Sequence, residues 1–232
     1  MSFVLGIDTS SVELGMGLTN GQQPVVGVSR YIRNSHAEHI SRTVLFLLES
    51  CAIKPSDISH AAIAVGPGSF TGLRIGISFL KGFCFGTGIR VLPVSSLESM
   101  ATSWQCLDRP IISAFDARNG EVFWARFEPH GETVKRRTDD CLSSLDIMKS
   151  AIQEGDTVLI DTLGYVKSSV FQNFSGRPRV YAVERHPLQR GLACARAGMR
   201  ALDEPNAWVN AEAILPRYLS ATTMEKRLAA RA

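Results

Sequence analysis

Acidic and glycine residues at the ends of predicted strands are the groups in this sequence that could bind a phosphate. Asp8 follows the apolar run FVLGI, and Asp116 follows the run IISAF. A carboxylate at a strand end can hold magnesium, which binds phosphate oxygens, or it can accept hydrogen bonds from the backbone of the following turn. The glycine-rich stretch GPGSFTGLRIG, from 66 to 76, lies between a predicted strand and a predicted helix, where anions often bind. The resulting candidate nucleotide site consists of Asp8, Gly66, Gly68, Ser69, Arg74 and Asp116.

The glycine-rich stretch departs from both common phosphate-binding loops. A P-loop needs Lys and then Ser or Thr after its last glycine, but Leu73 and Arg74 follow Gly72. A dinucleotide loop would place its third glycine at 71 rather than 72. Pro67 also removes one backbone N–H group. We therefore expect this stretch to shape a packing helix rather than to cradle a nucleotide, with Arg74 either capping Asp8 or reaching a partner.

The order of predicted elements indicates a duplicated α/β unit. Each half begins with three strands in a meander and continues with alternating helices and strands. Asp8 and Glu13 in the first half are separated by the same five-residue step as Asp116 and Glu121 in the second. We expect one half at 1–104 and another at 105–232, with a helix at about 187–203 that packs back on either half and a weakly patterned tail after it.

Two helices of the first half are predicted to carry apolar surfaces, one on a single face and the other nearly all round. The helix at 35–52 begins with a capping box, Ser35 and Glu38, and the helix at 70–86 carries apolar residues on nearly all its faces. One sheet covers only one side of such a helix, so we expect a partner on the other side; burial by this chain alone is the alternative. Gly76→Arg should then block a close approach and leave the chain folded. The expected interface residues are Val44, Leu47, Leu48, Gly72, Leu73, Gly76, Ile77, Leu80 and Cys84.

Composition and the remaining motifs exclude several classes of protein. The chain has 232 residues, 45% of them apolar, and a net charge of +3, which is too small to indicate a nucleic-acid-binding protein. The five cysteines are widely spaced and the N-terminal residues do not resemble a signal peptide, so we expect a reducing, cytoplasmic location. His36 and His39 lack an evident third ligand, so solvated histidines are favoured over a metal site.

Several stretches together resemble the bacterial TsaB family, also called YeaZ. These are IDTS at 7–10, GPGSFTGLRIG, SFLKG at 78–82, VSSLESMA at 94–101, DARNGEVFWARF at 116–127 and LPRYL at 215–219. The resemblance covers nearly the whole chain. It implies a duplicated actin-like ATPase fold (ASKHA, RNase H-like) with two βββαβα-type subdomains, which agrees with the predicted repeat.

The resemblance also implies a function. TsaB proteins are partners of a larger relative, TsaD, and with the ATPase TsaE they help to form threonylcarbamoyladenosine at position 37 of tRNAs that read ANN codons, from threonylcarbamoyl-AMP. We expect a non-catalytic subunit that binds TsaD, or pairs with itself when TsaD is absent, and that reaches tRNA through the complex. Direct tRNA contact through Arg177, Arg179, Arg185 and Arg190 is an alternative to a solvated surface for these residues.

The catalytic machinery of the relative is not matched by this sequence. The histidines of its HxEGH metal motif align with Ser96 and Met100, which cannot replace two imidazole ligands, and Glu98 already has a predicted capping role. The glycine pair of its second phosphate loop, SGGHT, is absent from the hairpin at Asp116. We therefore expect no catalytic residue, metal or cofactor in this chain, with ATP and metal on the partner subunits. A small actin-like kinase or ATPase is the alternative, and a metallopeptidase is a third hypothesis.

Overall fold

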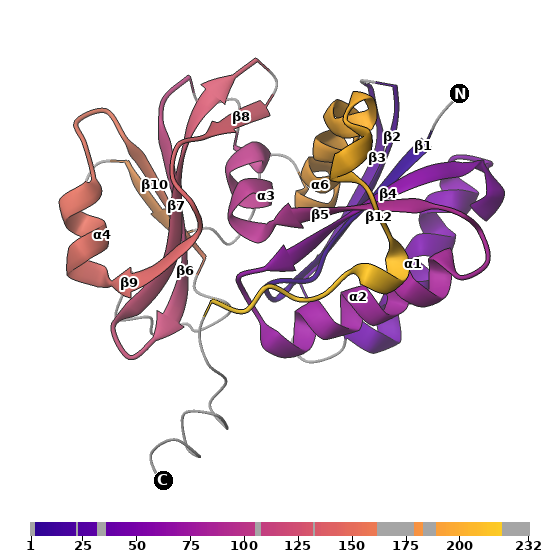
Figure 1. Ribbon diagram of the computed structural model, residues 1–232, viewed down its shortest axis with the longest axis horizontal. Coiled ribbons are helices and arrows are strands. Elements are labelled where there is room, and N and C mark those ends of the chain that lie inside the picture. Colours follow the sequence, from indigo (N-terminus) through magenta and orange to yellow (C-terminus); the bar gives the residue numbers. More distant parts are fainter. Residues whose placement is uncertain are drawn as a thin grey trace, which may run out of the picture.

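The computed structural model describes residues 3–21, 23–31, 36–104, 108–131, 133–161, 179–182 and 189–219 (Figure 1). The described chain forms two mixed sheets with helices packed on their faces. Ser35, Arg177, Arg185 and the chain beyond 219 lie outside the described residues, and so do the expectations that concern them.

The first sheet combines an antiparallel meander with two parallel strands. Its strand order is β12-β5-β4-β1-β2-β3, in which β4 and β5 run parallel to β1 and β12 closes the edge beside β5. Most side chains of β1 and β2 are buried, because helices cover both faces of the sheet. The strands are β1 (Phe3–Asp8), β2 (Glu13–Asn20), β3 (Gln23–Tyr31), β4 (Ile58–Gly66), β5 (Arg90–Ser95) and β12 (Val209–Asn210).

The second sheet repeats this arrangement in the order β11-β10-β6-β7-β8, with β9 pairing with β7. The order matches β5-β4-β1-β2-β3, so the predicted duplication is confirmed. The registers differ, however: Asp8 lies opposite Gly15, whereas Asp116 lies opposite Val122, one residue nearer the turn. The strands are β6 (Ile111–Arg118), β7 (Glu121–His130), β8 (Thr133–Arg136), β9 (Cys141–Ser144), β10 (Thr157–Asp161) and β11 (Val180–Ala182).

The helices show that each half supplies a helix to the other half's sheet. Helix α3 comes from the first half of the sequence, yet its apolar residues cluster with the second sheet. Helix α6 comes from the second half and packs on β1, β2 and β4 of the first sheet. In Figure 1 both lie between the two sheets, α1 and α2 cover the other face of the first sheet, and α4 covers the far face of the second. The helices are α1 (His36–Ser50), α2 (Phe70–Cys84), α3 (Ser96–Ser103), α4 (Leu145–Ala151) and α6 (Arg190–Arg200).

Glycines bring α6 into backbone contact with the first sheet. A Cβ atom added at Gly6 would lie 2.0 Å from the carbonyl oxygen of Gly191, and one added at Gly191 would lie 2.2 Å from the Cα atom of Met16. Gly17 faces the backbone of Leu192 in the same way. Because no side chain larger than hydrogen fits at these positions, α6 is held against β1 and β2 at the closest possible distance.

The residues that follow α6 return along the first half. After the 3₁₀ turns at Ala201–Asp203 and Pro205–Ala207, β12 pairs with β5 and a third turn follows at Ala211–Ala213. The backbone N–H of Arg217 then donates to the carbonyl oxygen of Val65, 2.7 Å away. The weakly patterned tail therefore packs along the first half as far as Arg217, and Leu219 then packs against the core of the second sheet.

Helices α1 and α2 of the first half each bury one face against the rest of this chain. Helix α1 packs its Ile40, Val44, Leu47 and Leu48 against the sheet and α2, and α2 buries Leu73, Ile77, Leu80 and Cys84 in the same core. Ser69 begins α2 as its N-cap, since its hydroxyl accepts a hydrogen bond from the N–H of Gly72. Among the described helices, none has the length and apolar character needed to cross a membrane.

Candidate functional site

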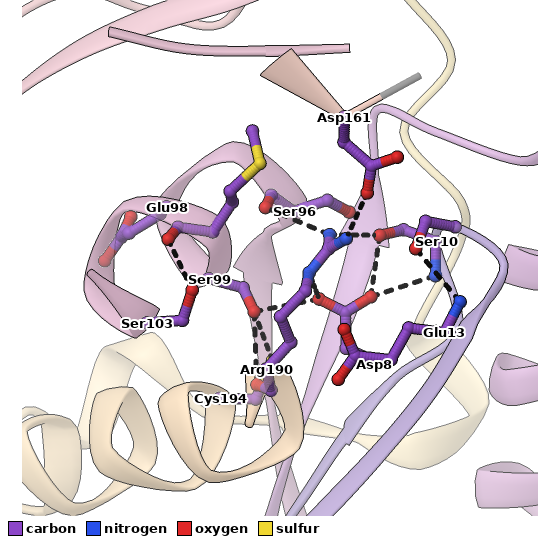
Figure 2. A network of polar contacts seen from close by, with 12 residues as sticks. Asp8, Ser10, Glu13, Ser96, Glu98, Ser99, Ser103, Asp161, Arg190 and Cys194 are labelled. Carbon is purple, nitrogen blue, oxygen red and sulfur yellow. Dashed lines mark hydrogen bonds and ion pairs between the residues drawn. The ribbon is translucent and has the colours of Figure 1, made fainter. Parts of the chain in front are cut away.

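Asp8 ends β1 inside the protein, with both carboxylate oxygens engaged. Its Oδ1 atom accepts hydrogen bonds from the backbone N–H and the hydroxyl of Ser10, at 2.9 and 2.6 Å. Its Oδ2 atom accepts from the hydroxyl of Ser99 on α3, at 2.8 Å, and from Nε of Arg190, at 3.0 Å. Asp8 therefore sits in a network contributed by β1, α3 and α6, which Figure 2 shows from close by.

Arg190, the first residue of α6, lies at the centre of this network. Its side chain is 1% exposed. Besides Nε, which binds Asp8, its Nη1 donates to Oδ2 of Asp161 at 3.0 Å, and its Nη2 donates to the hydroxyl of Ser10 at 2.6 Å and to the carbonyl oxygen of Ser96 at 3.4 Å. Every nitrogen of the guanidinium group is thus used, and the group also lies over the ring of Phe115, 5.1 Å from its centroid.

The electrostatics of this network favour an ionised arginine. Burial by itself would lower the pKa of Arg190, but the carboxylates of Asp8, Asp161 and Glu13 outweigh that effect and raise the pKa. Glu13 lies at the start of β2, and its burial raises its own pKa, which Arg190 and the Ser29 hydroxyl partly offset. The charges therefore hold one another in place in an interior where an unpaired charge would be costly.

The glycine-rich stretch packs on the turn that follows Asp8. The N–H of Ser69 donates to the carbonyl oxygen of Ser10, at 2.7 Å. An added Cβ atom would lie 2.4 Å from this same oxygen at Gly68, and 2.1 Å from the carbonyl oxygen of Thr9 at Gly72. These glycines let α2 approach the turn, which agrees with the prediction that the stretch shapes a packing helix.

Arg74 and Asp116 lie outside the Asp8 network. The Nε of Arg74 donates to the hydroxyl of Tyr218, at 2.9 Å, and its guanidinium lies 3.8 Å from the centroid of the Phe70 ring, so it does not cap Asp8. Asp116 accepts from the backbone N–H of Arg118 within its own hairpin, at 2.8 Å. The carboxylate that the second half contributes is instead Asp161, at the end of β10.

The structure corrects two expectations about basic and imidazole side chains. Arg190, predicted as a solvated or tRNA-facing residue, is fully buried because two carboxylates and the packing of α6 enclose it. His36, predicted to be solvated, is buried at the start of α1, with Nε2 2.9 Å from the carbonyl oxygen of Ser11. Ser95 caps α3 by accepting a hydrogen bond from the backbone N–H of Glu98, whose carboxylate pairs with Arg136 and Arg200.

The roles of Arg190 and Asp161 were not predicted from the sequence, although a signal for the first was present. Gly6, Gly15 and Gly17 on two adjacent strands, together with the small residues of RGLACARAG, are the pattern of a helix docked closely on a sheet. That pattern would have placed the start of the helix near the end of β1. No comparable pattern singled out Asp161.

The side chains predicted to meet a partner are core residues in this structure. Val44, Leu47, Leu48, Leu73, Ile77, Leu80 and Cys84 are at most 5% exposed. Gly72 and Gly76 face Thr9, and an added Cβ atom at Gly76 would lie 2.3 Å from the Thr9 hydroxyl, so Gly76→Arg would disturb the fold itself. Only the more exposed neighbours of these residues on α1 and α2 lie at the surface.

Those neighbours include several large apolar side chains. Leu45 and Phe46 on α1 are each 55% exposed, and Phe85 at the end of α2 is 80% exposed. Phe79 and Phe83 stack on each other along α2 with their ring centroids 6.0 Å apart, and both are only partly buried. We call these five residues the helix-pair surface.

The residues around Asp8 do not fit a bound magnesium–phosphate group. Both oxygens of Asp8 are taken, and the position beside it is filled by the guanidinium of Arg190, which would repel a metal ion. In the described part of the chain, no group of three or more His, Cys, Asp or Glu side chains is placed to hold a metal. The arrangement is that of a charged structural junction.

The two sheets with their repeated strand order give this chain a duplicated fold of the actin-like ATPase type. The activator of 2-hydroxyisocaproyl-CoA dehydratase from Clostridium difficile, solved with bound ADPNP, has this fold; it superposes with a TM-score of 0.51 at 11% identity, covering 94% of this chain and 100% of that one. YeaZ from Pseudomonas aeruginosa is more similar, with a TM-score of 0.78, 25% identity, and the same two shares covered.

Sequence comparison assigns the family. The model of the TsaD family, described as tRNA N6-adenosine threonylcarbamoyltransferase, matches residues 28–175. The tRNA threonylcarbamoyladenosine biosynthesis protein TsaB of Bacillus subtilis (strain 168) is 34% identical over 125 residues, which make up 54% of this chain and 55% of that protein. The chain belongs to this family, within its TsaB (YeaZ) group. It spans little more than half the length of the curated relative that it matches.

Proposed function

We propose that this chain acts in the biosynthesis of tRNA threonylcarbamoyladenosine as a non-catalytic partner subunit. In this proposal it binds a TsaD-type catalytic subunit, works with a TsaE-type ATPase, and supports modification of position 37 in ANN-decoding tRNAs. The family match and the names of its TsaB relatives support the pathway. The role of partner subunit rests on the surface of the molecule.

The observation that carries this role is the helix-pair surface. Leu45, Phe46 and Phe85 are more than half exposed on helices that otherwise contribute to the core. Burying a large apolar side chain contributes about 1.5–3 kcal/mol, so a partner that covers several of them gains substantial binding energy. Aromatic side chains are enriched in the central parts of protein interfaces. We infer that α1 and α2 of this chain meet matching helices of the catalytic subunit.

We propose that the same surface pairs with a second copy of this chain when the catalytic subunit is absent. In a two-fold dimer, the same patch of each chain meets that of the other. The exposed apolar side chains of α1 and α2 would then pack against the same side chains of the second copy. The two assemblies would then compete for one surface. In this proposal tRNA is reached through the complex; of the candidate contact residues, Arg190 is buried and Arg179 is exposed.

An actin-like kinase or ATPase is the competing function, and the Asp8 network argues against it. Such an enzyme needs a carboxylate that is free to bind magnesium and phosphate, whereas Asp8 is bound on both oxygens by this chain's own groups. We propose that the chain has no cofactor of its own and that ATP and metal act on the partner subunits. Calorimetric titration of the isolated chain with Mg-ATP should give no binding heat.

The first experiment reconstitutes tRNA modification from a TsaD-type subunit, a TsaE-type ATPase, threonylcarbamoyl-AMP, ATP and tRNA, with and without this chain. Mass spectrometry of the tRNA should show threonylcarbamoyladenosine that depends on the chain. Phe46→Arg should weaken binding to the TsaD-type subunit by roughly 30-fold, the loss expected when an interface anchor worth about 2 kcal/mol is removed.

Ile147→Arg is the matched control. Ile147 lies on α4 of the second half and is 57% exposed, almost the same as Phe46, but it lies far from the helix-pair surface (Figure 1). We expect this variant to bind and support modification as the unmodified chain does. Equal weakening by both substitutions would rule out α1 and α2 as the binding site, and modification that proceeds fully without the chain would refute the proposed function.

A further inference from the structure

The contacts of Arg190 cross from one half of the molecule to the other. Asp8 and Ser10 belong to the first sheet and its turn, whereas Asp161 and Phe115 belong to strands β10 and β6 of the second sheet. Ser96 begins α3, which packs on the second sheet. In Figure 2 the guanidinium lies between Asp8 on one side and Asp161 on the other.

The geometry of these contacts constrains the relative orientation of the two sheets more than apolar packing would. An apolar surface tolerates sliding, but a forked guanidinium binds its acceptors in fixed directions. Here Nε and Nη1 of one rigid planar group bind carboxylates of different sheets, each at 3.0 Å. A change in the relative orientation of the sheets would break at least one of these bonds.

Burial makes such a break unfavourable. The side chains of Arg190, Asp8 and Asp161 are 1%, 1% and 6% exposed, so water does not replace a bond that is lost. A buried charge left without its partner is strongly destabilising, whereas the intact pair needs only good geometry to persist. The network therefore favours one arrangement of the two halves over all nearby ones.

We propose that Arg190 is an internal clamp that fixes the two halves of this protein in one relative orientation. Two-domain chains move about their junction by default unless the interface prevents it. In this molecule α6 is fixed to the first sheet by its glycines, and its first residue holds the second sheet through Asp161. The chain is thus a single rigid body. This inference does not depend on the proposed function.

The test compares two buried carboxylates, Asp161 at the end of β10 and Asp156 immediately before its first residue. Asp161→Asn removes the charge that joins the halves and leaves the Asp8–Arg190 pair in place. Asp156→Asn is the matched control, because Asp156 is equally buried and pairs with Arg126 at 2.8 Å within the second half alone. Arg190→Lys is a second test: it keeps the positive charge and removes the planar fork.

The readout is the distance distribution between spin labels on the two halves, measured by pulsed electron paramagnetic resonance on the full chain. The labels are introduced by Gln23→Cys at the start of β3 and Asp146→Cys on α4, both exposed positions, with the cysteines at 51, 106 and 141 changed to serine. Cys84 and Cys194 stay unlabelled, because burial raises the pKa of both thiols, that of Cys84 to about 11.

The clamp predicts one narrow distance distribution for the parent chain and for Asp156→Asn. Asp161→Asn should broaden the distribution or add a second distance, and Arg190→Lys should do the same, while circular dichroism shows that both variants stay folded. A distribution for folded Asp161→Asn as narrow as that of Asp156→Asn would overturn the proposal, as would a broad distribution in the parent chain.

Discussion

Helices α6 and α3 each pack on the sheet of the other half, but through opposite kinds of contact. Each crosses to the sheet of the other half, and the two contact each other between the sheets. Helix α6 meets the first sheet through Gly6, Gly17 and Gly191, backbone against backbone. Helix α3 meets the second sheet through large side chains, Leu97 and Met100, which pack with the aromatic ring of Phe115 and its neighbours.

The difference shows what each junction is suited to do. A junction of large side chains can repack when one of them changes, because neighbouring side chains have alternative rotamers. Backbone atoms in direct contact cannot move apart without separating the two elements. The α6 junction therefore sets a fixed distance, and that distance is what brings the guanidinium of Arg190 to the carboxylate of Asp8. The hydrogen-bond distance between Arg190 and Asp8 therefore depends on glycines that carry no side chain at the α6 junction.

The largest effect should come from adding a side chain to the α6 junction. In Gly191→Val the new Cβ atom would lie 2.2 Å from the Cα of Met16, so we expect no folded protein by circular dichroism and size-exclusion chromatography. Gly82→Val is the control, because nothing lies within 4 Å of a Cβ atom on that exposed turn of α2. On α3, Leu97→Ala should cost about 2–5 kcal/mol and still give a folded chain. A folded Gly191→Val protein would remove the distinction between the two junctions.

A smaller effect should separate Asp8, which ends β1, from Asp116, which lies two residues before the end of β6. Asp8→Asn leaves Arg190 with one fewer charged partner in the interior, which should lower the free energy of unfolding by about 3–5 kcal/mol. Asp116→Asn weakens a hydrogen bond to the N–H of Arg118, a loss of about 1 kcal/mol. Urea denaturation of both variants measures the two values. Similar values would mean that the duplicated halves use these carboxylates alike.

The sequence predicted the repeated strand order and the two long helices of the first half closely. Helices expected at 35–52 and 70–86 are found at His36–Ser50 and Phe70–Cys84, because apolar periodicity and capping residues are local signals. It did not predict which apolar face of α2 meets the sheet, since a helix that is apolar nearly all round gives no preferred direction. Leu73 and Ile77 were assigned to a partner for this reason and lie in the core.

The burial of Arg190 could not be predicted from local signals either. Arginine is a surface residue by default, and the two carboxylates that enclose it are 182 and 29 residues away in the chain. The same holds for Asp161, whose position at a strand end resembles that of many solvent-exposed acids. Buried charges of this kind depend on tertiary contacts, whereas the glycines that allow those contacts are visible in the sequence.

The smallest expected effect is the pH dependence that Glu13, a buried residue at the start of β2, gives to the free energy of unfolding. Burial raises the pKa of Glu13 above its ordinary value, so between the unfolded and folded pKa values the native protein holds more protons than the unfolded chain. Stability from this residue is therefore present at low pH and is lost as the pH rises through that window, by about 1.4 kcal/mol for each unit of difference between the two pKa values.

Glu13→Gln does not titrate and keeps an oxygen that can accept a hydrogen bond from the Ser29 hydroxyl. In urea denaturation, the variant should gain stability relative to the parent chain as the pH rises above 4.5, the ordinary pKa of this carboxyl. A difference in the free energy of unfolding that stays constant as the pH rises would show that the attraction of Arg190 fully offsets the effect of burial on the pKa of Glu13. The stability of the α6 junction would then not depend on the titration of this residue.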